Sequence, residues 1–193
     1  GNTPCKFYKQ NTHGGGVRDP FVIHWPKGIA ASEAGSVRTQ FHHVSDVAPT
    51  LLELIGAQMP AEIGGVAQMP MHGTSMAYAI HNGADPTRKK VQHFEMVGHR
   101  GIVVDGWKAV TRHKFRTPLF DDVWELYDLN NDFSESNDLA AQMPEKLDEM
   151  IETWWEEAAK YKVLPVSDGM GTINKRPPRR SFRLWPGLER LPS

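Results

Sequence analysis

The sequence predicts an α/β protein whose second half is locally α+β, and three patterns support this prediction. An apolar, β-branched run at residues 20–25 is followed by an amphipathic segment at residues 46–55, as in a strand–helix unit. Residues 91–129 change to short alternating runs separated by turn residues. Residues 144–161 return to helical spacing of apolar side chains. We therefore expect part of an α/β domain followed by a small antiparallel sheet with one packed helix.

In the first half, punctuation residues set the expected boundaries. The run PFVIHW at residues 20–25 predicts a buried strand. Ser45 is expected to cap the next helix at its start, and Gly56 is expected at its C′ position. Residues 57–75 are rich in Gly, Pro and Met without periodicity, which predicts a long loop. Residues 75–82 fit one short helix.

In the second half, the pattern favours hairpins and a final helix. Residues 91–97 alternate as a strand, and Asp105-Gly106 is a typical hairpin turn. Residues 124–129 form a further expected strand. Pro144 stands at the favoured first-turn position of the final helix.

We expect three regions: residues 1–75 as the end of an α/β domain, residues 76–165 as the small sheet subdomain, and residues 166–193 as an extended basic tail. The basic residues of the tail fit an arm lying over another domain better than a site for an anionic polymer.

Composition excludes several classes of protein. The 22 basic and 23 acidic residues nearly cancel, so bulk charge gives no support for nucleic-acid binding. No apolar run approaches the roughly 20 residues of a membrane helix. Cys5 is the only cysteine of the chain, so an internal disulfide is impossible.

The most informative stretch is residues 8–20, YKQNTHGGGVRDP. Three consecutive glycines allow the backbone to approach another group closely or to adopt positive φ. Lys9 is a mobile point charge suited to a sulfate or phosphate. A glycine-rich surface loop with a solvated lysine explains the same residues, and the residues alone leave both interpretations open.

Several motifs in order resemble the sulfatase family, over roughly residues 3–165. The run KQNTHGGGVRDP is followed by an apolar run and WPKG, and HVSDVAPTLLELIG, DGWKAVTRH and WELYDLNND come later. In that family a Lys precedes, by nine positions, the Arg of a G-G-x-R-x-P run, and Lys9 and Arg18 keep this spacing with Pro20 after them. The wording is most similar to bacterial arylsulfatases.

The resemblance implies a fold, a reaction and roles for five residues. The fold would be the end of an alkaline-phosphatase-like α/β sandwich plus a small antiparallel subdomain. The reaction would be hydrolysis of a sulfate-ester small molecule by a formylglycine nucleophile, assisted by Ca²⁺. Lys9 would be catalytic and would bind the sulfate, and His13 would lie at the substrate pocket. Gly15, Gly16 and Arg18 would support the site, with Arg18 paired to an acid.

The chain also departs from the family pattern. It lacks the C/S-x-P-x-R motif that yields formylglycine, and Cys5 is followed by Lys-Phe-Tyr-Lys. The calcium ligands of the family would lie upstream of Gly1, so no metal ligand is assigned here. We expect a C-terminal fragment that is inactive alone and needs the missing N-terminal sulfatase domain. A bacterial cytoplasmic and a periplasmic location both stay open.

Two alternatives to arylsulfatase activity also stay open. The first is a phosphonate monoester or phosphodiester hydrolase of the same superfamily. The second is a non-catalytic binding module derived from a sulfatase.

Two further pairs were weighed as site residues. His42 and His43 could suggest a metal, but one histidine hydrogen-bonded near the helix start is the simpler interpretation. His99 and Arg100 could reach the rim of a pocket from a strand connection.

Overall fold

The computed structural model describes residues 2–169, which fall into two units. One unit contains the sheet with its packed helix, and the other contains two short helices and a small hairpin. The first comprises residues 2–18, 93–102 and 106–169, and the second residues 19–92 and 103–105. Within residues 2–169, none of the helices is long and apolar enough to cross a bilayer.

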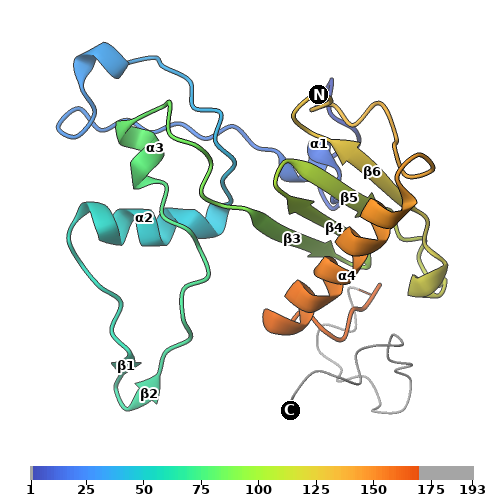
Figure 1. Ribbon diagram of the computed structural model, residues 1–193. Helices are drawn as coiled ribbons and strands as arrows, with labels where there is room; N and C mark the ends of the chain where they lie inside the picture. The colour runs from blue at the N-terminus through green and yellow to red at the C-terminus, as the bar shows by residue number, and fades with distance from the viewer. Residues whose placement is uncertain (1, 170–193) are drawn as a thin grey trace. The chain divides into compact units, whose positions relative to one another are not determined.

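A four-stranded sheet forms the centre of the first unit (Figure 1). Its strands are β3 (Val91–Met96), β4 (His99–Val104), β5 (Trp107–Thr111) and β6 (Trp124–Asp128), in the order β3-β4-β5-β6. Strands β5 and β6 pair antiparallel, with Trp107 opposite Asp128 and Thr111 opposite Trp124. The predicted antiparallel sheet is therefore confirmed.

Two tight turns connect the first three strands. Asp105 and Gly106 have φ values of 46° and 83°, so the predicted Asp-Gly turn is confirmed. Val97 and Gly98 form the second turn, with φ values of 47° and 89°. The sequence did not reveal this turn, because a β-branched residue at positive φ is uncommon.

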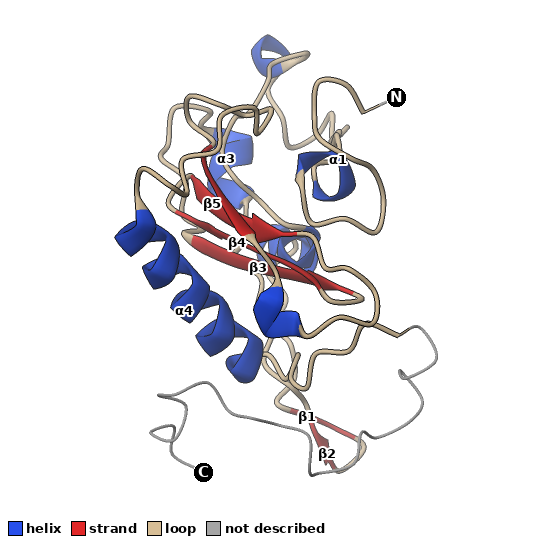
Figure 2. Cartoon of the chain, turned by 90° about the vertical axis from the view of Figure 1, so that its right-hand side faces the viewer, coloured by secondary structure: helices blue, strands red, loops and turns tan. Residues whose placement is uncertain are grey.

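Helix α4 (Pro144–Lys160) lies along one face of the sheet, with Pro144 in its first turn as predicted (Figure 2). It contacts β5 and β6. The side chain of Trp154 is fully buried, and its indole N–H donates to the Phe94 carbonyl oxygen at 3.0 Å. Burial of a large aromatic ring with a satisfied N–H makes this residue the centre of the helix–sheet core.

The N-terminal segment covers the opposite face of the sheet, where the short helix α1 (Gly14–Val17) lies (Figure 2). Alternation along β6 separates the two faces. Trp124 packs against Trp154 of α4, whereas Glu125 and Tyr127 contact Lys6 of the N-terminal segment. A connection containing a 3-10 turn at Leu119–Asp121 joins β5 to β6.

The second unit contains α2 (Val47–Leu54), α3 (Ala77–His81) and a hairpin of β1 (Glu62–Ile63) and β2 (Val66–Ala67). Short 3-10 helices cover Ala31–Glu33 and Val44–Asp46. Helix α3 confirms the helix expected within residues 75–82. The hairpin lies inside the stretch expected to be a loop, and its two glycines have φ values of 57° and 80°.

The start of α2 differs from the expectation. The Ser45 side chain does not cap the helix. His43 accepts a hydrogen bond from the Ser45 backbone N–H, and the Asp46 carboxylate accepts one from the His43 backbone N–H. The prediction of one histidine hydrogen-bonded near this helix start is confirmed, whereas the cap at Ser45 is wrong. Gly56 follows the helix with a φ of 68°, as its predicted C′ position requires.

The buried strand expected at residues 20–25 is not formed. These residues belong to no strand, and the side chains of Phe21 and Val22 are 61% and 87% exposed. A strand needs a neighbouring strand to satisfy its backbone groups, and none of the described residues supplies one here. The apolar run therefore lies uncovered in this chain.

The expected division at residues 75 and 165 stays a prediction. The sheet unit begins with residues 2–18, because this segment packs on β6 rather than on residues 19–92. Most of the expected basic tail, residues 170–193, lies outside the described residues.

Trp154 provides a test of the helix–sheet core. Trp154→Ala is expected to lower the free energy of unfolding by about 3–5 kcal/mol, because it leaves a cavity and an unpaired Phe94 carbonyl. Chemical denaturation measures the change. Glu156→Ala on the exposed side of the same helix is the control, with a change within about 0.5 kcal/mol. Equal effects of the two substitutions would contradict the packing described for α4.

Candidate functional site

Lys9 lies on a turn of the loop formed by residues 6–13, hereafter the Lys9 loop. Its side chain is exposed, and within the described part of the chain its ammonium group has no ion-pair partner. Phe7 and Gln10 beside it have φ values of 61° and 74°, which non-glycine residues rarely adopt. The loop therefore holds an unneutralised cation in a constrained backbone.

Both ends of the Lys9 loop bind one carboxylate, that of Glu125 on β6. The Lys6 ammonium lies 3.2 Å from Glu125 Oε2, and His13 Nε2 lies 3.2 Å from Glu125 Oε1. Tyr127, on the same face of β6, donates its hydroxyl to Glu125 and accepts a hydrogen bond from Lys6 at 2.6 Å. A single side chain of the sheet thus joins residues that are seven positions apart in the loop.

The electrostatics of this cluster favour an ionised Glu125. Hydrogen bonding from His13, helped by Tyr127 and Lys6, lowers the pKa of Glu125 to about 2 against an opposing effect of burial. Burial, followed by the neighbouring Glu125 carboxylate, raises the pKa of the Tyr127 hydroxyl. Glu125 is therefore an anion and Tyr127 a neutral donor at neutral pH.

His13 itself is fully buried, and its ring contacts the ring of Phe7 edge-on, with centroids 4.7 Å apart. Its Nδ1 atom is buried without a hydrogen-bond partner among residues 2–169. The geometry places His13 beneath the loop and against Glu125. Its assignment to substrate binding stays a prediction.

A second buried carboxylate, that of Glu135, holds the next turn of the chain. The Gly14 backbone N–H donates to both oxygens of Glu135 at 3.0 Å, and the Lys108 ammonium lies 2.5 Å from Glu135 Oε1. Both charged side chains are almost fully buried. Burial lowers the pKa of Lys108, and the Glu135 carboxylate opposes that shift. Neutralised in this way, the pair anchors α1 to the sheet.

Gly15 and Gly16 are needed because the chain folds back on itself. A Cβ atom on Gly15 would lie 2.2 Å from the Phe7 carbonyl oxygen, and one on Gly16 would lie 2.0 Å from the Asn11 carbonyl oxygen. No larger residue fits without moving the backbone. These contacts agree with the supporting role predicted for the two glycines, which admit the Lys9 loop rather than a ligand.

Arg18 does not pair with an acid as expected. Its guanidinium lies over the ring of Phe133, 5.0 Å from the ring centroid, and no carboxylate of the described residues bonds to it. Asp19 follows it directly along the chain, where side chains point apart. Stacking on an aromatic ring replaces the expected ion pair.

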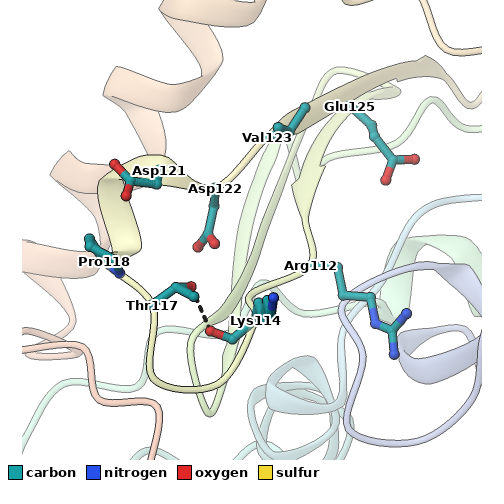
Figure 3. Close-up of a pocket in the computed structure, with 8 residues that line it drawn as sticks. All are labelled: Arg112, Lys114, Thr117, Pro118, Asp121, Asp122, Val123 and Glu125. Atoms are coloured by element: carbon teal, nitrogen blue, oxygen red, sulfur yellow. Dashed lines mark hydrogen bonds between the residues drawn. The ribbon is translucent and has the colours of Figure 1, made fainter.

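A hollow of about 450 Å³ lies beside the Lys9 loop, where the connection between β5 and β6 meets the start of β6 (Figure 3). Glu125 lines it, as do Arg112 and Lys114. The Arg112 guanidinium also lies 4.9 Å from the ring centroid of Phe7. The hollow and the loop therefore share the Glu125 carboxylate.

Arg100 and His99 are structural rather than part of a pocket rim. Arg100 is buried, donates to the Leu119 carbonyl oxygen at 2.6 Å and pairs with Asp122. His99 Nδ1 accepts the His113 backbone N–H at 3.0 Å. The expectation that Arg100 reaches a rim is wrong, because its charge is already neutralised in the core.

The calcium ion implied by the family resemblance was tested against the donors present. Across residues 2–169, no group of three His, Cys, Asp or Glu side chains could hold a metal ion. The carboxylates near Lys9 are occupied by Lys6, His13 and Lys108. These residues do not fit a calcium site.

Exposed Lys9 on a strapped loop, beside a small antiparallel sheet with one packed helix, is the arrangement of a sulfatase C-terminal portion. The family described as "N-sulphoglucosamine sulphohydrolase, C-terminal" matches residues 5–162. The chain belongs to this family.

Similar proteins agree with the family. An uncharacterized sulfatase of Schizosaccharomyces pombe is 28% identical over 169 residues, covering 86% of this chain and 29% of that protein. An N-acetylglucosamine-6-O-sulfatase of Bacteroides thetaiotaomicron is 27% identical over 154 residues, covering 75% of this chain and 25% of that protein. The chain therefore spans less than a third of the length of these relatives.

Solved structures share the fold. Ps i-CgsB in complex with k-i-k-neocarrahexaose matches with a TM-score of 0.59 and 25% identity, over 82% of this chain and 32% of that chain. The alkaline-phosphatase-like fold of these sulfatases confirms the predicted fold class.

Sequence reasoning missed Glu125, Tyr127, Lys108 and Glu135. One signal was available for the first two, since alternation in WELYD places Glu125 and Tyr127 on the same face of the strand. Nothing in the sequence indicates that this face receives the N-terminal loop.

The pKa of Glu125 predicts how acid affects stability. Because the folded pKa of about 2 lies below the ordinary 4.5, this carboxylate stabilises the fold fully above about pH 4.5. That contribution is lost as pH falls toward about 2. Glu125→Gln is expected to lower the free energy of unfolding at pH 6, with a deficit that shrinks as the pH approaches 2.

Denaturant unfolding at several pH values measures the deficit. Glu156→Gln, an exposed carboxylate on α4, is the control and should show no such trend. A deficit for Glu125→Gln that stays constant from pH 6 to pH 2 would contradict an ionic role for this carboxylate.

Proposed function

We propose that the complete protein hydrolyses sulfate esters, releasing sulfate and an alcohol, and that Lys9 contributes to the reaction directly. The observation that carries this proposal is the free, exposed ammonium of Lys9 on an anchored loop, in a chain matched to the sulfatase family over residues 5–162. A fixed cation stabilises the sulfate oxygens and the negative charge that develops on the leaving oxygen.

The proposed activity is that of an arylsulfatase. The motif wording around Lys9 supports this class. Relatives named for N-acetylglucosamine-6-O-sulfate and a neighbour solved with k-i-k-neocarrahexaose support a comparison with sulfated sugars. An aryl sulfate and a sugar 6-O-sulfate are therefore the two substrates to assay in parallel, with a phosphonate monoester as the third.

The formylglycine nucleophile and the calcium ligands of this proposal belong to the remainder of the protein. When bound, calcium would supply positive charge to the sulfate oxygens. This chain supplies Lys9 and the scaffold that holds it. On this proposal the chain alone does not turn over substrate.

The remainder of the sulfatase is also the proposed partner of the uncovered apolar run. Phe21, Val22 and Ile23 are exposed in succession, and Val22 is almost wholly so. Consecutive exposed apolar side chains favour contact with another surface. The short span relative to the relatives supports a large missing neighbour.

Lys9→Ala in the complete protein is expected to lower kcat on para-nitrophenyl sulfate by about 10²–10³-fold, as loss of one electrostatic contact to the transition state does. The unfolding midpoint should stay unchanged, because the side chain is exposed and unpaired within the described chain. Steady-state kinetics and thermal unfolding measure the two effects.

Lys160→Ala is the matched control, since Lys160 is an exposed lysine on α4 with only a surface pair to Glu157. It should retain full activity. Full activity of Lys9→Ala would overturn the assignment of Lys9, and faster turnover of the phosphonate than of either sulfate would overturn the choice of ester.

A further inference from the structure

The Lys9 loop is closed by one side chain from outside it. Lys6 and His13 are its two end residues, and they bind different oxygens of the same Glu125 carboxylate, each at 3.2 Å. Lys9 lies three residues after the first contact and four before the second. Glu125 is therefore placed to set how far the two ends lie apart, and with them the turn that carries Lys9.

The loop needs such a restraint because its backbone is strained. Phe7 and Gln10 both have positive φ, and conformations of this kind cost about 1–3 kcal/mol each. Strain of this size persists only where surrounding contacts hold it. Without a closing contact, the loop would relax and the Lys9 ammonium would sample a wider volume.

Other contacts fix the loop locally but do not close it. The Asn11 backbone N–H donates to the Tyr8 carbonyl oxygen at 3.2 Å, and Thr12 donates its hydroxyl to the Arg100 carbonyl oxygen at 3.0 Å. The Gly15 N–H donates to the Lys6 carbonyl oxygen at 2.8 Å. Of these ties, only the Glu125 carboxylate is charged and reaches both ends through side chains.

We propose that Glu125 is a positioning residue for Lys9: by holding Lys6 and His13 together, it fixes the Lys9 ammonium where the sulfate ester reacts. This inference rests on the proposed function of Lys9 and adds a residue that the family motif around Lys9 does not contain. The charged and titratable groups that face Glu125 are Lys6, His13 and Tyr127, with Arg112 lining the adjoining hollow.

The test uses the complete protein and para-nitrophenyl sulfate. Glu125→Gln keeps the shape of the side chain but removes its charge, so the loop is held less tightly. We expect kcat to fall about 10- to 100-fold, because small misplacements of a catalytic group have effects of this size. KM should change less than about threefold, since the lost interaction acts in the transition state. Glu156→Gln carries the same chemical change on exposed α4 and should leave both constants unchanged.

A double-mutant cycle with Lys9→Ala separates positioning from a general loss of structure. If Glu125 acts through Lys9, Glu125→Gln should lower kcat less than about twofold further in the Lys9→Ala background. Multiplicative losses in the double variant would overturn the proposal, because Glu125 would then act independently of Lys9. Unchanged kcat for Glu125→Gln alone would overturn it as well.

The failure of this inference differs from the failure of the proposed function. Full activity of Lys9→Ala removes the role of Lys9 and the positioning role with it. A large loss for Lys9→Ala, combined with full activity of Glu125→Gln, removes only the positioning role.

Variants that release one end of the loop keep the test informative if Glu125→Gln unfolds. Lys6→Met frees the first end, and His13→Gln keeps a donor at the second. We expect Lys6→Met to lower kcat and His13→Gln to retain more activity than His13→Ala. Equal, full activity of Lys6→Met and His13→Ala would overturn the proposal.

Discussion

The Glu125 carboxylate is the contact on which the candidate site depends. It joins the two ends of a strained loop to one strand of the sheet, and the exposed Lys9 lies between those ends. The hydrogen bonds it accepts keep it ionised, so the contact persists across neutral pH. A rigid strand thus sets the geometry of a loop that lacks regular structure, as functional groups on loops generally require.

Around this contact, buried charges are neutralised in pairs. Lys108 with Glu135 holds α1, and Arg100 with Asp122 holds the connection that leads into β6. Each pair would be costly to break, because removal of one partner leaves an uncompensated buried charge. The charge left without a partner near the loop is that of Lys9, among the residues described. Such an arrangement leaves one cation available for an external anion.

Local patterns predicted the sheet subdomain well. Alternation, the Asp105-Gly106 turn and Pro144 placed the strands and the final helix, because each depends on neighbouring residues. The run at residues 20–25 was wrong because a strand needs partners that no local pattern reports. Glu125 and Glu135 were missed for a related reason: their partners lie more than 100 residues away, and only the fold brings them together.

The most direct measurement of the central claim is a crystal structure of the complete protein with a non-hydrolysable sulfate-ester analogue bound. The account predicts the Lys9 ammonium within about 3.2 Å of a sulfate oxygen. It also predicts Lys6 and His13 still on the two oxygens of Glu125. A bound analogue contacted by other cations, with Lys9 directed into bulk solvent, would contradict it.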